Sequence, residues 1–304
     1  MPINPAGRTI PAATHHRGGV NAADIHYVTA GDAGTPVLLV HGFPESWWAF
    51  HGLIPLLART HRVIAVDLRG FGDSSAAAPE DDSTTAAEDL HALIAHLGLG
   101  PVHLLVQDIS GAAGLRLSLR HPDSLLSLTG VETGFAGFGL EIAADMSRGG
   151  AWYIGPLATP HVADTFFRGR EAALIGQFLL PVAVADRESV SSDSVAEFAR
   201  GYARQGGWSG AGMLYGSMVK ESADLQALAA ARATALPTLA VDRAGSAFTA
   251  DALGAALGGT VRHAQIANVG HYIAQEAPAA LAEALLPFFA AVDAHGHLHA
   301  DAGD

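Results

Sequence analysis

The sequence predicts an α/β fold, in which a mostly parallel, doubly wound sheet carries an inserted helical cap. Buried strands alternate with helices from residue 36 to residue 131 of the 304-residue chain. The alternation stops between residues 135 and 229, where aromatic residues and helical patches replace buried strands, and it resumes at residue 237. We therefore expect a core domain of residues 1–134 and 230–304 and a helical cap domain of residues 135–229.

The first half of the chain alternates between strand and helix patterns. Asp24–Ala30 alternates in strand fashion, and the turn signal GDAGTP follows it. Pro36–Val40 and Val102–Val106 are almost continuously apolar, as strands buried on both faces are. We expect strands over residues 24–30, 36–40, 61–68, 102–106 and 125–131, and helices from near residue 46, over 84–97 and over 111–120.

The second half begins with the segment that lacks strands. Residues 135–229 contain helical patches such as VADTFFRGREAALIGQFLL and AGMLYGSMVKES. After them we expect strands over 237–241 and 261–266, a helix near 250–257 and a last amphipathic helix over 278–292. The final AHGHLHADAGD is expected to be solvated, and its three alternate histidines are not expected to bind a metal.

Composition limits the partners of the chain. Acidic residues outnumber basic ones by 30 to 17, so nucleic acid and anionic membrane surfaces would repel a net charge of −13. Cysteine is absent, which excludes disulfides and thiolate metal sites. The N-terminus lacks the apolar core of a signal peptide, and no apolar run reaches the length of a membrane span, so we expect a cytoplasmic protein. We expect no cofactor and no metal, because the RGFG stretch lacks the spacing and the downstream acid of a dinucleotide loop.

Asp108 stands where a strand turns sharply into a helix. The apolar run 102–106 ends close to it, and small residues and leucines at helical spacing begin at Gly111. This layout is typical of a nucleophile elbow, which raises a reactive side chain on a tight turn. A carboxylate in that place attacks an sp³ carbon and forms an ester on the enzyme, so the substrate would be an epoxide or an alkyl halide. The alternative is that Asp108 only caps the helix.

Glu132 and His271 each follow a strand of the same expected sheet. Ligands bind beyond the carboxyl ends of parallel strands, so these two side chains and Asp108 would meet there. The chain order nucleophile, acid, histidine is the one seen in α/β-hydrolases. The Gly-Phe-Pro turn after strand 36–40 also leaves backbone N–H groups free near Phe43, which would form half of an oxyanion hole.

Four stretches together resemble the epoxide hydrolase branch of the α/β-hydrolase fold: HGFPESWW, VDLRGFGDSS, the aspartate elbow and VGHYIAQEAP. The resemblance implies an oxyanion hole made by the N–H groups of Phe43 and Ile109. It also implies two cap tyrosines that hold the epoxide oxygen, for which Tyr215 and Tyr153 are the candidates, with Trp152 an open alternative to Tyr153. The substrate pocket that it implies is lined by His41, Pro44, Trp47 and Trp152.

The chain departs from the family pattern at two places. The elbow reads VQDIS, so Val106 and Ser110 replace the usual flanking glycines, and more crowding is expected there. The acid that many members place after a strand similar to PTLAV would fall near Ser246, and Asp242 comes too early. The acid is therefore assigned to Glu132, as in the subgroup that places it after the preceding strand.

The resemblance implies hydrolysis of a hydrophobic, small-molecule epoxide to a diol. Asp108 would open the ring while the two tyrosines donate hydrogen bonds to its oxygen. His271, oriented by Glu132, would then activate the water that hydrolyses the ester. Whether the chain forms a homodimer stays open.

Other functions remain as alternatives. A haloalkane or haloacid dehalogenase would use the same triad, but haloalkane enzymes of this fold usually place tryptophan directly after the nucleophile, where this chain has Ile109. Fluoroacetate enzymes place arginine there and again three residues on, where this chain has Ala112. A non-catalytic ligand-binding protein of this fold is expected to have a broken triad. A serine esterase would need Ser110 at the apex of the elbow, which is the place of Asp108.

Overall fold

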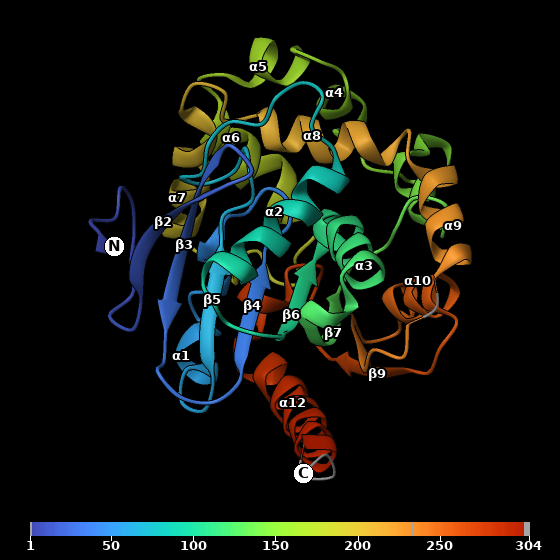
Figure 1. The fold of residues 1–304 in the computed structure, drawn as a ribbon. Coiled ribbons are helices and arrows are strands. Elements are labelled where there is room, and N and C mark those ends of the chain that lie inside the picture. Colours follow the sequence, from blue (N-terminus) through green and yellow to red (C-terminus); the bar gives the residue numbers. More distant parts are fainter. Residues whose placement is uncertain (1, 233, 301–304) are drawn as a thin grey trace.

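The computed structural model describes residues 2–232 and 234–300. In these ranges the chain forms a nine-stranded sheet with the order β1-β2-β3-β5-β4-β6-β7-β8-β9 (Figure 1). In this order, every neighbouring pair from β5 through β4 to β9 is parallel. The pairs β1–β2, β2–β3 and β3–β5 are antiparallel. The strands are β1 (Pro2–Ile3), β2 (Thr14–Val20), β3 (Ala23–Ala30), β4 (Pro36–Val40), β5 (Arg62–Val66), β6 (Val102–Gln107), β7 (Leu125–Val131), β8 (Thr238–Arg243) and β9 (Val261–Ile266).

Helices pack on the sheet because its central strands are apolar on both faces. Every residue of β4 and of β6 is buried. Helices α2 (Ser83–His96) and α3 (Gly111–Arg120) pack against each other, and α3 covers β6 and β7 (Figure 1). The other core helices are α1 (Ile54–Leu57), α10 (Phe248–Leu257), α11 (Ile273–Glu276) and α12 (Pro278–Ala300). The predicted fold class, a mostly parallel sheet wound with helices, is confirmed.

In the first seventy residues one strand was not predicted and one helix was predicted too long. The sequence THHRGGV was not identified as a strand, yet it forms β2, because its pairing with β3 and not an apolar pattern holds it in the sheet. The helix expected from near residue 46 is two short pieces, a 3₁₀ turn over Trp47–Phe50 and the single turn α1. Gly52 and Pro55 explain the interruption, since glycine is a poor helix former and proline favours a helix start.

The last helix is longer than predicted. α12 continues to Ala300 instead of ending at residue 292, so the first part of the expected solvated tail is helical. Residues 301–304, where that prediction also falls, lie outside the described residues. Among the helices of the described ranges, none has both the length and the apolar character that a membrane span requires.

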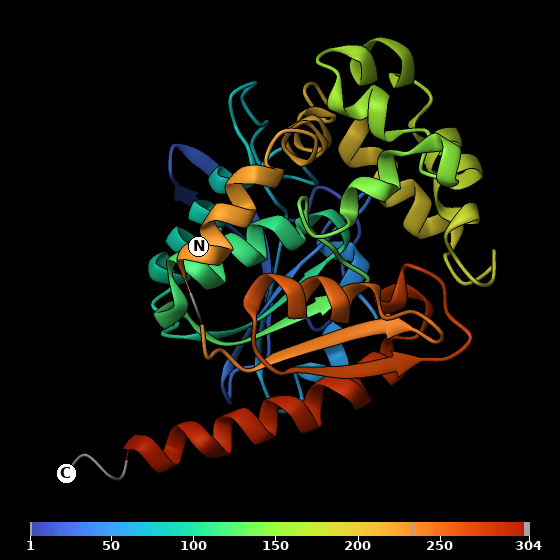
Figure 2. The same cartoon turned by 90° about the vertical axis from the view of Figure 1, so that its right-hand side faces the viewer.

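In the described part of the segment between β7 and β8, all regular secondary structure is helical. The helices are α4 (Ile154–Ala158), α5 (Val162–Phe167), α6 (Glu171–Ala173), a π-helical turn (Leu174–Leu179), α7 (Ser192–Ala203), α8 (Ser209–Met218) and α9 (Ser222–Ala231), with 3₁₀ turns at Leu140–Ala144, Met146–Arg148 and Leu180–Val182. Figure 2 shows the helices from α4 to α8 at the top and upper right, with α9 farther to the left and α12 along the bottom of the view.

Polar contacts fix the inserted helices to the sheet. The indole N–H of Trp48 donates to Ser194 Oγ of α7 at 3.0 Å. The guanidinium of Arg200, also on α7, donates to both carboxylate oxygens of Asp73 at 2.8 and 2.9 Å. Near the end of the insertion, Arg116 of α3 pairs with Asp224 of α9 at 2.6 Å. The insertion is therefore held to the core at α7 and at α9.

Candidate active site

The sharp turn after β6 presents the Asp108 side chain. Asp108 begins a 3₁₀ turn that joins β6 to α3, and its φ of 54° lies in the left-handed region that non-glycine residues rarely adopt. The hydroxyl of Ser110 donates to Gln107 O at 2.7 Å, and the hydroxyl of Thr133 donates to Asp108 O. A Cβ at Gly42 would lie 2.4 Å from Asp108 Cβ, so only glycine lets the neighbouring loop come this close.

The structure brings His271 and Glu132 to Asp108. His271 Nε2 lies 3.2 Å from Asp108 Oδ1, and His271 Nδ1 lies 3.4 Å from Glu132 Oε2. Glu132 is itself held by Arg243, whose backbone N–H and guanidinium donate to its two oxygens at 2.7 Å each. Like Asp108, Glu132 has a left-handed backbone, with φ of 43°. The three side chains come from the ends of three strands or from the loops after them.

Asp242, the other carboxylate near this strand end, has a different set of partners. Its oxygens accept from the backbone N–H groups of Thr249 and Ala250 at the start of α10, at 2.9 and 3.3 Å. His263 Nε2 lies 2.9 Å from the same carboxylate. Asp242 therefore caps a helix, and Glu132 is the acid beside His271.

Opposing effects set the protonation of the His271 and Glu132 side chains. Burial lowers the pKa of His271, but hydrogen bonds with Asp108 and Glu132, together with their charges, outweigh it and raise the pKa to about 10. Burial opposes ionisation of Glu132, yet its bonds with His271 and the Arg243 N–H leave the pKa of the carboxyl below its usual range. The resting site thus holds an imidazolium next to carboxylates.

Backbone N–H groups were expected to form an oxyanion hole at Phe43 and Ile109. The Phe43 N–H donates to Asp108 Oδ2 at 2.8 Å, so one carboxylate oxygen already lies on this donor. Asp108 Oδ1 is the oxygen that faces His271. Among the described residues, no hydrogen bond joins the Ile109 N–H to the Asp108 side chain, although Ile109 is buried beside it.

The two expected tyrosines meet near the ring of Phe43. The ring centres of Tyr153 and Tyr215 are 6.0 Å apart, and they lie 5.6 and 5.3 Å from that of Phe43. Burial, then the Asp108 charge, raises the pKa of Tyr153, while its hydrogen bond with Tyr215 opposes the rise. Burial chiefly raises the pKa of Tyr215 as well. Both phenols therefore stay protonated and can donate hydrogen bonds.

The expected pocket residues lie in different surroundings. His41 and Pro44 are buried, and His41 Nε2 accepts from the Leu68 N–H at 3.2 Å. Trp47 is buried against His15 and another tryptophan, with ring centres 5.1 and 5.6 Å away, and no contact with Asp108 is found for it in the described part of the chain. Trp152 is 43% exposed and packs edge-on against Tyr153.

Sequence reasoning missed a buried carboxylate beneath the site. Glu45 accepts from Gln107 Nε2 and from Gln275 Nε2, at 2.6 Å each. Burial raises the pKa of Glu45 to about 8, against the opposing bond from Gln275. The only signal in the sequence is the position of Gln107 directly before Asp108 and of Glu45 directly after the Gly-Phe-Pro turn. Their contacts join residues 62 and 230 positions apart.

Two further tyrosines close the site and were also missed. Tyr202 is fully buried, its ring centre is 5.9 Å from that of Phe43, and its hydroxyl has no hydrogen-bond partner within the described residues. Tyr272, next to His271, donates its hydroxyl to Phe43 O at 3.3 Å. The site is thus walled by aromatic rings, and Tyr202 offers one more buried hydroxyl.

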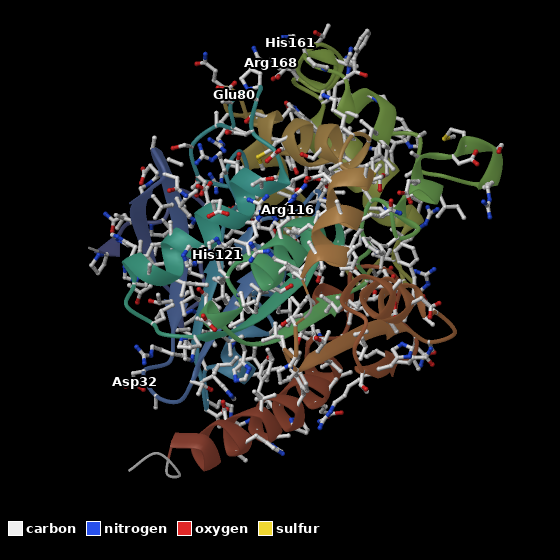
Figure 3. All side chains as sticks on the ribbon, turned by 45° about the vertical axis from the view of Figure 1, so that its right-hand side comes forward. Asp32, Glu80, Arg116, His121, His161 and Arg168 are labelled. Atoms are coloured by element: carbon white, nitrogen blue, oxygen red, sulfur yellow. The ribbon has the colours of Figure 1, made fainter. Side chains whose placement is uncertain are left out.

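A separate cavity of about 620 Å³ lies between the loop at residues 77–82 and helices α4, α5 and α8. Arg116 and His161 are among its lining residues, and Figure 3 shows His161 near the top of the molecule with Arg116 well below it. Neither Asp108 nor Tyr215 lines this cavity. It is therefore distinct from the candidate active site.

Comparison with known proteins gives one family match and three similar proteins. The family described as the alpha/beta hydrolase fold matches residues 35–218. The soluble epoxide hydrolase of Corynebacterium sp. (strain C12) is 30% identical over 292 residues, 91% of this chain and 97% of that protein. A fluoroacetate dehalogenase of Burkholderia sp is 40% identical over 103 residues, 32% of this chain and 34% of that protein. The solved structure of the epoxide hydrolase CorEH has a TM-score of 0.81 at 26% identity, covering 92% of this chain and 99% of that one.

Proposed function

The chain belongs to the α/β-hydrolase fold family, and on that premise we propose that it is an epoxide hydrolase working through a covalent ester on Asp108. One observation carries the proposal: Asp108 has one oxygen on the Phe43 N–H and the other beside His271, near two protonated tyrosines. We assign the core domain to residues 1–134 and 230–304 and the cap to 135–229, so the nucleophile and the tyrosines come from different domains.

Ring opening is the first step. Asp108 Oδ1 attacks an epoxide carbon, the bond from that carbon to the ring oxygen breaks, and an ester and an alkoxide form. Tyr153 and Tyr215 donate hydrogen bonds to the oxygen as charge develops on it, and these bonds lower the barrier because they stabilise that charge.

Hydrolysis of the ester is the second step. Alkylation removes the Asp108 charge that helps to keep His271 protonated, so the pKa of His271 falls. His271 therefore loses one proton while the alkoxide gains one. Neutral His271, oriented by Glu132, then takes a proton from water, and the hydroxide attacks the ester carbon. The Phe43 N–H holds the oxyanion on Oδ2. As the bond from the Asp108 carboxyl carbon to Oδ1 breaks, His271 gives its proton to the leaving oxygen and the diol departs. The new carboxyl group then passes its proton to His271, and the carboxylate returns.

The test is the intact mass of the His271→Gln protein after exposure to a panel of epoxides and alkyl halides. Blocking hydrolysis should trap the ester, so we expect an adduct equal to a whole epoxide that is absent from an Asp108→Asn protein. His263→Gln is the matched control, because His263 pairs with Asp242 away from the nucleophile, and it should turn over without an adduct.

The same protein tests the tyrosines. In the His271→Gln background, Tyr153→Phe and Tyr215→Phe should each slow adduct formation by about tenfold or more, since one of two donors to the leaving oxygen is lost. Equal rates in all three proteins would remove both residues from the mechanism while leaving the Asp108 ester in place.

A dehalogenase is the second candidate, favoured by the similarity to the fluoroacetate dehalogenase. Against it, Ile109 and Ala112 are apolar and buried, where this reaction would need groups that hold a halide. The mass experiment separates the two functions: an adduct that equals an alkyl group without its halogen, and none from any epoxide, would establish the dehalogenase.

A further inference from the structure

Two histidines and an aspartate meet at the end of the sheet opposite Asp108. His61 lies directly before β5, His103 is the second residue of β6, and Asp293 lies in α12. One ligand atom from each falls within 4.8 Å of the other two, and His103 Nε2 is 3.1 Å from Asp293 Oδ1. Parallel strands begin at this edge, so the chain brings together three elements far apart in sequence.

Each of the three side chains has an outer hydrogen bond to a hydroxyl. Thr60 Oγ1 lies 2.8 Å from His61 Nδ1, and Ser127 Oγ lies 2.8 Å from His103 Nδ1. Thr35 donates its hydroxyl to Asp293 Oδ2 at 2.9 Å. Outer partners of this kind fix the ring orientation and tautomer of metal-bound histidines, and they leave Nε2 of each ring for the ion.

The protein encloses the two imidazoles and leaves the carboxylate partly open. His103 is fully buried and His61 nearly so, and the ring of Phe289 stacks on His103 with centres 4.3 Å apart. Asp293 is 22% exposed, which gives an ion and a water ligand a path to the site.

A second His/Asp group shows what a purely structural cluster looks like. His26, Asp67 and Asp73 also bring their ligand atoms within 4.8 Å of one another. His26 resembles His103, with one nitrogen 2.7 Å from Asp67 of its cluster and the other 3.0 Å from His15 outside it. The two clusters differ at the aspartate. Asp67 also accepts from the N–H groups of Trp47 and Asp73. Its ligand atoms therefore face protein partners, and it carries no proposal.

We propose that His61, His103 and Asp293 form a binding site for Zn²⁺, with water as the fourth ligand. Zinc takes imidazole nitrogen and carboxylate oxygen at about 2.0–2.2 Å, which places tetrahedral ligand atoms roughly 3.4 Å apart. The His103 and Asp293 atoms already have nearly this spacing, and His61 completes the set by a small side-chain movement. The ion joins β5, β6 and α12, so its role is to stabilise the attachment of the last helix to the sheet.

Zinc titration of the whole chain by calorimetry tests the site. The protein used is untagged and carries His121→Gln, His295→Gln, His297→Gln and His299→Gln, because the tail histidines and the stacked surface pair of His91 and His121 could bind zinc themselves. We expect one Zn²⁺ per chain and, at a hundredfold excess over Kd, a rise in Tm of about 5 °C that a chelator reverses.

Two variants in that background decide the assignment. Asp293→Asn preserves shape and should weaken zinc binding by at least tenfold, and His61→Gln should abolish the rise in Tm. Exposed Asp251→Asn is the matched control and should bind like the parent. Each variant is compared with its own metal-free melting curve, so a folding defect is seen directly. Absence of saturable binding in the parent, or unchanged affinity in Asp293→Asn, would overturn the proposal.

Discussion

The His271 imidazole lies between two carboxylates, and its proton links the chemistry of the site to the stability of the fold. Its pKa is about 10 in the folded chain, against 6.5 for an unperturbed histidine. Because the folded value is the higher one, the stabilisation is fully present below about pH 6.5 and is lost as the pH rises through 10.

We therefore expect the free energy of unfolding to fall between pH 7 and about pH 10. Asp108→Asn removes one of the two charges that raise the His271 pKa, so its unfolding free energy should fall less over the same range. Urea denaturation at a series of pH values measures both slopes, with exposed Asp251→Asn as the control. A slope in Asp108→Asn equal to that of the parent would show that His271 does not carry this pH dependence.

At the residue scale, the sequence predicts positions best where a side chain follows a strand end. Asp108, Glu132 and His271 lie together as expected, because the end of a buried strand fixes where each side chain emerges. Trp47 and Ile109 were assigned from the resemblance, and orientation decides their contacts: Trp47 faces His15, and the Ile109 N–H has no bond to Asp108 in the described residues. Glu45 could not be found, because its two glutamine partners are brought to it only by the complete fold.

At the scale of elements, close approach of α3 to β6 depends on Gly114. A Cβ at this position would lie 2.6 Å from Val106 Cγ1, and Val106 is fully buried in the sheet. The valine that replaces the family's usual glycine in the elbow is thus accommodated by a glycine on the helix. If both Val106 on the strand and position 114 on the helix carried a side chain, α3 and the turn that presents Asp108 would be pushed away from the sheet.

Two glycine-to-alanine changes test this. Gly114→Ala should lower the free energy of unfolding by about 1–3 kcal/mol through overpacking. Gly254→Ala, in the interior of α10 with nothing within 4 Å of its Cβ, should raise it by about 0.5–1 kcal/mol, because alanine is the better helix former. Thermal or urea denaturation measures both, and the same sign for the two variants would contradict this account.

Elements with their own apolar pattern were predictable, and those held by partners were not. The strands β4, β6 and β7 were placed within one or two residues, because the pattern of buried apolar residues alone defines them. β2 has histidine, arginine and glycine in place of such a pattern, and its buried His15 has a ring nitrogen 3.0 Å from a ring nitrogen of His26 on β3.

At the scale of the molecule, the seam between core and inserted helices includes a bidentate ion pair. Asp73 is 12% exposed and Arg200 is 31% exposed, and Glu197 also accepts from the same guanidinium. Arg8 and Asp193, 44% and 60% exposed, form a second pair near α7 that is open to solvent. Because the first pair is partly buried, it should stabilise the folded chain more than the exposed second pair does.

Asp73→Asn should therefore lower the free energy of unfolding by about 1 kcal/mol and speed amide hydrogen exchange in α7. Asp193→Asn should leave the free energy of unfolding within about 0.5 kcal/mol of the parent and the exchange in α7 unchanged, because an exposed ion pair contributes little to stability. Hydrogen exchange followed by mass spectrometry resolves α7 from the sheet. Equal protection of α7 in the two variants would show that the Arg200 pair does not hold the seam.

The left-handed backbone of Asp108 and Glu132 sets a limit on how this protein can be improved. Such conformations cost of order 1–3 kcal/mol each in residues other than glycine. Selection for heat resistance alone would favour asparagine or glycine at both positions, since these residues tolerate that backbone. Under the proposed mechanism, such chains would be more stable but would lack the nucleophile or the acid. Directed evolution toward a hardier catalyst therefore needs a turnover screen in every round, and consensus stabilisation belongs at positions away from these two turns.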